Sequence, residues 1–274
     1  MKIGGRDFKE SGHTYVMGIL NVTPDSFSDG GKWNDVDRAL DRVESMVEEG
    51  ADVIDIGGES TRPGYVMISC EEETERILPV IEAVKKRFDI PISLDTCKAE
   101  TARWGISAGA CMINDIWGLR FDDKMADVIA GSGLPCCLMH NRRSAEYGDF
   151  LQELKNDLKE TIKLAKLAGI GEERIILDPG VGFAKSYEQN LKIIGHLEEL
   201  KELGCPLLLG CSRKSVVGLT LNLPVEERLE GTLATTVLAV MQGCMFVRVH
   251  DVRENVRVIK MAEAVLSGGR DYVL

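Results

Sequence analysis

The chain lacks both an excess of positive charge and any long apolar run. It has 33 Lys and Arg against 44 Asp and Glu, a net charge of −11 at pH 7. That balance argues against general affinity for nucleic acid or membrane surfaces, which are themselves anionic. The longest apolar stretch, 233–241, contains two threonines and falls far short of the roughly 20 residues that span a bilayer. An anionic small molecule would therefore need a local cluster of Arg, Lys or His.

Cysteine is present, but the pairs of cysteines typical of metal sites and redox motifs are missing. None of the eight cysteines forms a C-x-x-C pair, and most fall in apolar runs. Reduced core cysteines of a cytosolic protein have this distribution. The first 13 residues are polar and charged, which is not the pattern of a signal peptide. We therefore expect a cytoplasmic protein with free thiols.

What is present is a repeat of short apolar runs that end abruptly in polar residues and alternate with helical patterns. Such a repeat over 274 residues predicts a single-domain (β/α)8 TIM barrel covering 1–274, because this fold takes about 250 residues as one domain. A small hairpin at 2–9 is expected to plug the barrel bottom. The expected strands are 15–20, 52–56, 92–94, 111–113, 136–139, 175–177, 206–209 and 245–249. The expected helices are 35–49, 70–87, 99–108, 150–168, 187–203, 226–241 and 252–266.

Function in such a barrel is expected where the strands end, because the loops that follow the strands converge on one face. The polar residues at or just after the strand ends are Asn21, Asp55, Asp95, Asn114, His140, Asp178, Ser212 and Arg248. His140 is expected to act behind the site. His196 is expected in a helical stripe with a structural role.

One group of these residues suits a flat heteroaromatic ring. A carboxylate accepts two parallel N–H donors, and a lysine donates to a carbonyl or ring nitrogen. The group consists of Asp95, Asn114, Asp178 and Lys214, with the apolar neighbours Ile116, Met139 and Phe183. The alternative is that the two aspartates form internal ion pairs at the barrel mouth.

A second group suits phosphate oxygens. Arg248 and His250 alternate along one extended segment, so they project to the same side just before a predicted helix start. Asn21, Thr61 and Ser212 join them, and Asn21 offers an oxygen ligand for Mg²⁺, which commonly bridges substrate phosphates. The alternative for Arg248 is a surface ion pair with Asp251 or Glu254. His250 could likewise be a hydrogen-bonded histidine with no catalytic role.

The loops at 21–32 and 59–69 are rich in Ser, Asp, Thr, Gly and Pro. Lids that exclude water from a reacting carbon often have this composition. Arg62, which precedes Pro63, is a candidate for binding an anionic second substrate or a leaving phosphate. The alternative is an ordinary exposed turn.

The motifs as a set resemble the dihydropteroate synthases of the pterin-binding barrel superfamily over nearly the whole chain. Each motif alone is short, but all of them together and in order are specific. They are 17–31 (MGILNVTPDSFSDGG), 55–64 (DIGGESTRPG), 93–96 (SLDT), 113–115 (IND), 178–183 (DPGVGF), 212–214 (SRK), 231–234 (GTLA) and 248–252 (RVHDV). One departure is 141–144 (NRRS), where the family often has a Met, Gly and Thr-Pro segment.

The resemblance implies condensation of 6-hydroxymethyl-7,8-dihydropterin diphosphate with p-aminobenzoate, giving 7,8-dihydropteroate and pyrophosphate in folate biosynthesis. It also implies Mg²⁺ and a homodimer, which the apolar helices at 226–241 and 252–266 could form. The implied ring-binding residues are Asp95, Asn114, Asp178 and Lys214. The implied diphosphate-binding residues are Asn21, Thr61, Arg248 and His250, with Mg²⁺ at Asn21. On the p-aminobenzoate side the implied residues are Arg62, Pro63, Phe183, Lys214 and Ser215, and in the first loop Asp25, Phe27, Ser28 and Asp29.

The mechanism that fits is dissociative: pyrophosphate leaves first, and the arylamine then attacks the resulting cation. The residues assigned to catalysis are Asp25, Asp29, Arg62, Lys214, Arg248 and His250. No dedicated nucleophile is needed, so Cys97 is expected to be a bystander. Two other functions remain open, a methyltetrahydrofolate:corrinoid methyltransferase and a pterin-binding protein without catalysis. Lys214 and the complete first loop argue against the methyltransferase, and the two loops together argue against simple binding.

Overall fold

Eight parallel strands form a barrel in the computed structural model, which describes residues 1–10, 12–23, 32–59 and 66–269. Their order around the sheet is β8-β7-β6-β5-β4-β3-β10-β9. A parallel bridge between Leu177 and Leu207 joins β8 to the segment that leads into β9 and so closes the barrel. The strands are β3 (Tyr15–Asn21), β4 (Val53–Gly57), β5 (Ile92–Asp95), β6 (Met112–Asp115), β7 (Cys136–Met139), β8 (Ile175–Asp178), β9 (Leu208–Leu209) and β10 (Phe246–Val249). The predicted TIM barrel is confirmed.

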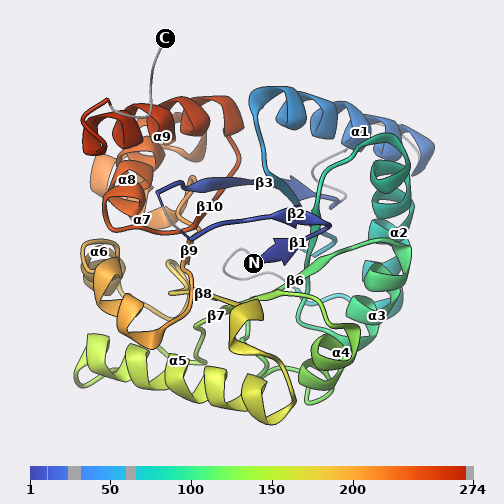
Figure 1. Ribbon diagram of the computed structural model, residues 1–274, viewed down its shortest axis with the longest axis horizontal. Helices are drawn as coiled ribbons and strands as arrows, with labels where there is room; N and C mark the ends of the chain where they lie inside the picture. The colour runs from blue at the N-terminus through green and yellow to red at the C-terminus, as the bar shows by residue number, and fades with distance from the viewer. Residues whose placement is uncertain (11, 24–31, 60–65, 270–274) are drawn as a thin grey trace.

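Helices form a ring around the strands (Figure 1). They are α1 (Lys32–Glu49), α2 (Cys70–Arg87), α3 (Ala99–Ala108), α4 (Met125–Ser132), α5 (Phe150–Leu167), α6 (Tyr187–Ile194), α7 (Ser215–Leu221), α8 (Leu229–Met241) and α9 (Val252–Leu266). Short 3-10 helices accompany them at Glu172–Arg174, Leu197–Leu203 and Val225–Glu227. None of the helices among the described residues is both long and apolar enough to cross a membrane.

The helix predicted at 187–203 was wrong as one continuous element. It divides after Ile194, where Gly195 ends α6 and His196 leaves helical geometry with φ −137° and ψ 36°. Glycine is a poor helix former, which explains the break at this point. His196 therefore lies exposed at the junction and hydrogen-bonds the Lys192 carbonyl, rather than lying in a helical stripe.

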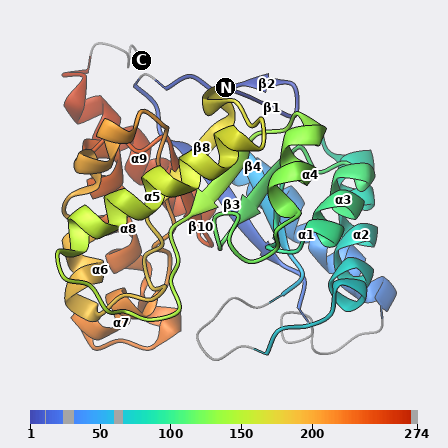
Figure 2. The same cartoon turned by 90° about the horizontal axis from the view of Figure 1, so that it is seen from below.

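The hairpin of β1 (Lys2–Ile3) and β2 (Arg6–Asp7) covers the amino-terminal end of the barrel, as predicted. Ile3 and Phe8 are buried against the side chains that fill this end. In Figure 2 the hairpin lies at the top of the molecule and α7 at the bottom, at the carboxyl ends of the strands. The site must therefore be built at the end opposite the hairpin.

The side chains that point into the barrel are apolar near the hairpin and become polar toward the carboxyl ends of the strands. Beneath the hairpin the barrel is filled by Met17, Val53, Met112, Cys137, Ile176, Leu208 and Phe246. Side chains two residues further along a strand point to the same side. Those positions are Ile19, Asp55, Asn114, Met139, Asp178, Gly210 and Arg248. The change from apolar to polar places a charged layer directly above a closed core. All eight cysteines are free, as expected.

Candidate active site

A partly buried guanidinium links two carboxylates at the centre of the mouth. Arg248 on β10 donates from Nε to Asp55 Oδ2 and from Nη2 to Asp95 Oδ2, both at 2.6 Å. Asn114 Nδ2 donates to the same Asp55 oxygen at 3.1 Å. The suggested ion pair of Arg248 with Asp251 or Glu254 is wrong. Arg248 bonds Asp95 of the ring group directly, and Asn114 of the ring group shares Asp55 with it. The ring group and the phosphate group therefore form one cluster, not two flanks.

Asp178 and Lys214 meet Arg248 around Gly210. A Cβ added at Gly210 would lie 3.5 Å from Asp178 Oδ2, 3.8 Å from Lys214 Nζ and 3.9 Å from Arg248 Cβ. The Gly180 N–H donates to Asp178 Oδ1 at 2.7 Å, and Lys214 Nζ donates to the Val181 carbonyl at 2.6 Å. A carboxylate oxygen and an ammonium group therefore lie close together beside a position that carries no side chain.

An apolar wall closes one side of this cluster. Cys97, Ile116 and Met139 form a small buried group of their own, with Phe183 packed against it. The Lys214 ammonium lies 4.8 Å from the centre of the Phe183 ring, within the range of a cation–π contact. The predicted apolar neighbours are thus confirmed as neighbours, and Cys97 joins them. Burial raises the pKa of the Cys97 thiol, so this thiol stays protonated and apolar in character.

Two side-chain pairs join the loop after β9 to the loop after β10. Ser212 Oγ lies 3.0 Å from His250 Nδ1, and Arg213 donates to both carboxylate oxygens of Asp251 at 3.0 and 2.5 Å. Arg213 has a φ of +56°, a conformation that is uncommon for a residue with a side chain. The pairs hold His250 at the mouth beside the segment that carries Lys214. Ser215, the first residue of α7, is exposed there.

Burial sets the protonation equilibria of the charged cluster. It raises the pKa of Asp95 to about 7, against the opposing effect of Arg248. It also raises the pKa of Asp178 and lowers that of Lys214. The Oδ1 atoms of Asp55 and Asp95 are buried and have no hydrogen-bond partner among the described residues. Buried acceptors without a partner are unfavourable, and N–H groups of a bound ring would satisfy them.

The sequence and the structure can now be compared with known proteins. A profile of the pterin binding enzymes matches residues 17–250. The dihydropteroate synthase of Clostridium beijerinckii is 58% identical over 267 residues, covering 97% of this chain and 99% of that protein. The Bacillus subtilis dihydropteroate synthase is 52% identical over 256 residues, covering 93% and 90%. The chain belongs to the pterin binding enzymes.

Solved structures agree with this family. The Clostridium difficile dihydropteroate synthase, determined in the presence of pteroic acid, superposes with a TM-score of 0.92 at 49% identity, covering 95% of this chain and 98% of that one. The Xanthomonas albilineans dihydropteroate synthase with 4-aminobenzoic acid gives a TM-score of 0.92 at 42% identity, covering 97% of each chain. The barrel of this pterin binding enzyme is therefore shared nearly from end to end.

Several residues predicted for the site of this pterin binding enzyme lie outside the described part of the chain. They are Asp25, Phe27, Ser28, Asp29, Thr61, Arg62 and Pro63. The two ends of the second loop are described and tied to the barrel. Glu59 accepts from the Ile68 N–H at 3.3 Å and from Lys98 Nζ at 2.5 Å, and buried Lys98 also donates to Glu73 at 2.9 Å.

Four residues of this pterin binding enzyme were not predicted for the site but contribute to it. Asp55 was noted only as a strand end, although it lies on the same strand face as Val53 and could have been found from that alternation. Cys97 was set aside because no nucleophile was needed. Arg213 and Lys185 lie in loops, where no periodicity indicates which partners they contact.

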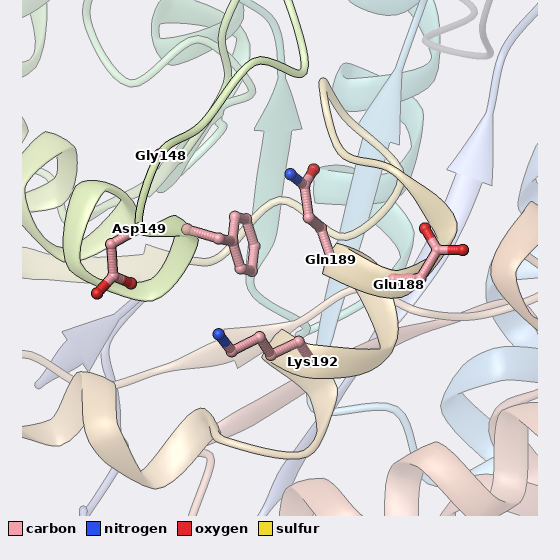
Figure 3. A pocket seen from close by; sticks show the side chains of 6 residues that line it. Gly148, Asp149, Glu188, Gln189 and Lys192 are labelled. Carbon is pink, nitrogen blue, oxygen red and sulfur yellow. The ribbon is translucent and has the colours of Figure 1, made fainter.

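A groove of about 480 Å³ lies outside this cluster, between the start of α5 and α6. Figure 3 shows side chains from the two helices around it. Its lining residues are Gly148, Asp149, Phe150, Glu188, Gln189 and Lys192. None of them belongs to the cluster at the strand ends, so the groove does not mark the site of this pterin binding enzyme.

Proposed function

We propose that the protein condenses 6-hydroxymethyl-7,8-dihydropterin diphosphate with p-aminobenzoate, releasing 7,8-dihydropteroate and pyrophosphate in folate biosynthesis. The observation that carries this proposal is a single mouth in which Asp95 Oδ1 lies in the same cluster as Asp178, Lys214 and Arg248. Asp95 Oδ1 is buried and accepts no hydrogen bond from the described part of the chain. Its dihydropteroate synthase relatives include a structure in complex with 7,8-dihydropteroate. The substrates are small molecules.

The ring side of the site is assigned to Asp95, Asn114, Asp178 and Lys214. Asp95 Oδ1 and Asp178 Oδ2 offer acceptors to the N–H groups of an amino-pyrimidinone edge, and Lys214 offers a donor to its oxygen or nitrogen. Met139 belongs to the apolar wall that the flat face of the ring would contact. The mixture of donors, acceptors and apolar contact suits a pterin better than an aliphatic substrate.

The diphosphate side is assigned to His250, Ser212, Arg248 and Asn21, with Thr61 from the undescribed loop. His250 is held by Ser212 and precedes the first turn of α9, whose free N–H groups favour an anion. Arg248 contributes positive charge from within the cluster. Its hydrogen bonds to Asp55 and Asp95 hold that charge beside the residues assigned to the ring, which supports a role for Arg248 at the bond that breaks.

The p-aminobenzoate side is assigned to Phe183, Lys214 and Ser215, with Arg62 and Pro63 from outside the described residues. The aromatic face of Phe183 and the adjacent ammonium of Lys214 are suited to an aryl ring and its carboxylate. Asp25, Phe27, Ser28 and Asp29 are assigned to the loop that covers the reacting carbon.

The reaction proceeds by loss of pyrophosphate before the arylamine attacks. The C–O bond at the pterin methylene breaks with both electrons leaving on the diphosphate, and the positive charge spreads into the ring. The carboxylates of Asp95 and Asp178 stabilise that charge, while Arg248 and His250 stabilise the departing anion. The amine lone pair then forms the C–N bond, and a proton leaves the nitrogen to water. An arylamine is neutral at pH 7, so positioning matters more than a base.

Asn21 is assigned as the one protein ligand of Mg²⁺. It ends β3 at the mouth and is partly exposed, and the described residues contain no group of three His, Cys, Asp or Glu that could hold a metal. A single amide oxygen fits Mg²⁺, which keeps several waters and takes further oxygens from phosphates. When bound, the ion would supply charge neutralisation to the diphosphate.

Asn21→Leu should therefore weaken binding of the pterin diphosphate at least about tenfold in Mg²⁺, measured by titration calorimetry. Chelation of divalent ions should have the same effect on the wild type. Binding of the pterin alcohol, which has no diphosphate, serves as the control and should be unchanged by either treatment. Equal loss for the diphosphate and the alcohol would contradict the assignment.

Turnover with each substrate omitted in turn tests the function itself. We expect pyrophosphate to be released only when pterin diphosphate and p-aminobenzoate are both present. A coupled phosphate assay measures this release. Release with pterin diphosphate alone would indicate a hydrolase, and no release with both would reject the proposal. Supplying methyltetrahydrofolate and a corrinoid instead tests the methyltransferase alternative, for which we expect no methyl transfer.

A homodimer through α8 and α9 is also proposed. These helices pack against each other, and both expose apolar side chains: Met241 is 60%, Met261 64% and Val265 67% exposed. Large apolar side chains exposed on two helices that pack together are the kind of surface that oligomers cover. Met241→Glu combined with Met261→Glu should convert a dimer to a monomer in light scattering after size exclusion. Leu167→Glu, at an exposed position on α5, should leave the dimer intact.

A further inference from the structure

Lys185, in the loop between β8 and α6, has three hydrogen-bond acceptors around one amine. Its Nζ lies 2.9 Å from His140 Nδ1, 3.0 Å from the Gly180 carbonyl and 3.0 Å from the Phe183 carbonyl. Two of these acceptors belong to its own loop and the third to the end of β7. A protonated amine has three N–H donors, one for each acceptor.

The histidine partner is itself fixed from the other side. His140 is 3% exposed, and its Nε2 lies 2.9 Å from Asp157 Oδ2 on α5. Burial lowers the pKa of His140 to about 4, so the ring is neutral: Nε2–H donates to Asp157, and Nδ1 accepts from Lys185. Arg142, from the segment that departs from the family pattern, donates to the same Asp157 oxygen at 2.5 Å. The loop after β8 is thus anchored to the loop after β7 and to α5.

The segment that Lys185 holds at Gly180 and Phe183 is the one that faces Lys214. The Val181 carbonyl accepts from Lys214 Nζ at 2.6 Å, and the Phe183 ring lies 4.8 Å from the same nitrogen. The loop between them has an unusual backbone, with φ of +71° at Gly180, +85° at Gly182 and +42° at Ala184. Glycine adopts a positive φ readily, but for Ala184 this conformation is uncommon and persists where surrounding contacts hold it. The two carbonyls bound by Lys185 lie on either side of Val181 and Gly182.

We propose that Lys185 is a positioning residue for the arylamine side of the site, fixing the Val181 carbonyl and the Phe183 ring against Lys214. This inference rests on the proposed function, because it names which of the two substrates depends on the loop. Lys185 does not itself touch either substrate in this assignment. Its removal should therefore affect p-aminobenzoate more than the pterin diphosphate.

The charge on Lys185 adds a readout that a purely structural residue would not show. Burial lowers its pKa to about 7. Asp178 and Asp157 favour the charged form, whereas Lys214 and Arg142 oppose it. As the pH rises through about 7, the amine loses a proton and can satisfy only two of its three acceptors. The KM for p-aminobenzoate should therefore rise between pH 6.5 and 9, a range in which that substrate does not titrate.

The test compares Lys185→Met, Lys185→Gln and a matched control, Lys192→Met, at an exposed position on α6. At pH 6.5 we expect Lys185→Met to raise the KM for p-aminobenzoate about tenfold or more, with the KM for pterin diphosphate within about twofold. The KM of Lys185→Met for p-aminobenzoate should be independent of pH. Lys185→Gln, which keeps two N–H donors without charge, should give a smaller, pH-independent increase. Lys192→Met should match the wild type.

The outcomes separate this inference from the proposed function. A wild type that releases no pyrophosphate rejects the function. An active wild type whose p-aminobenzoate KM rises with pH just as it does in Lys185→Gln rejects the inference. Equal increases in both KM values for Lys185→Gln, with pterin binding weakened in calorimetry, also reject it by showing a general loss of structure. If Lys185→Met does not fold, Lys185→Gln and the wild-type pH profile decide.

Discussion

Asp178→Ala should abolish binding of the pterin, with a loss of at least about 100-fold in affinity. Asp178 is 4% exposed, and one of its oxygens is already used by the Gly180 N–H. The other lies beside Gly210, close to Lys214. Removing the carboxylate deletes charge-assisted hydrogen bonds to the ring, each contributing about 1.5–3 kcal/mol. It also leaves the Lys214 ammonium without the negative charge of Asp178 that favours its charged form. Titration calorimetry with the pterin diphosphate measures the effect.

The control for this substitution is Asp149→Ala. Asp149 caps α5 by accepting from the Gln152 N–H and lines the groove outside the site. Its loss should reduce the free energy of unfolding by about 1 kcal/mol without changing pterin affinity. If Asp178→Ala bound the pterin within a few-fold of the wild type, Asp178 would have no part in recognising the ring.

The residues that the sequence placed correctly are those governed by periodicity. Alternation along short apolar runs predicts which side of each strand faces the barrel interior, and a parallel barrel brings all carboxyl ends to one mouth. Asp95, Asn114 and Asp178 follow from these two rules alone. The hairpin at the opposite end follows from the polar turn between Ile3 and Phe8, whose side chains complete the interior.

What the sequence did not predict depends on long-range pairing or on short elements. Arg248 and Asp55 are 193 residues apart, and no spacing rule identifies two such residues as an ion pair. The helix α7 has seven residues with a glycine among them, too few to show a helical period. Lys185 bonds two backbone carbonyls of its own loop. The sequence of side chains does not indicate where such carbonyls point.

The balance of charge inside the mouth explains why its residues act as a unit. Asp55, Asp95 and Asp178 are all nearly fully buried. Among the described residues Arg248, Lys214 and Lys185 supply positive charge that favours the ionised carboxylates. A buried carboxylate without a cation tends to take up a proton, and a protonated carboxyl cannot stabilise a cationic ring. Under the proposed function Arg248 therefore has two roles that a substitution can separate: neutralising the departing diphosphate and opposing protonation of buried Asp95.

Arg248→Met should lower kcat/KM at least about 1000-fold, because the leaving group loses a cation placed for the transition state. It should also reduce the free energy of unfolding by about 3–5 kcal/mol, since two buried carboxylates lose their partner. Steady-state kinetics and urea unfolding measure the two effects. Arg253→Met is the matched control, because Arg253 is more than half exposed on α9 and its loss should change neither quantity appreciably.

Combining Arg248→Met with Asp95→Asn distinguishes the two roles. The amide at position 95 removes one of the two carboxylates left without Arg248, so part of the lost free energy of unfolding should return. Turnover should stay at the level of the Arg248→Met variant or below it. Recovery of turnover together with stability would contradict a catalytic role, since it would mean that Arg248 serves only to balance Asp55 and Asp95. If the double variant kept the low free energy of unfolding but turned over normally, both roles would be contradicted. The cation at position 248 would then be needed by the fold and not by the reaction.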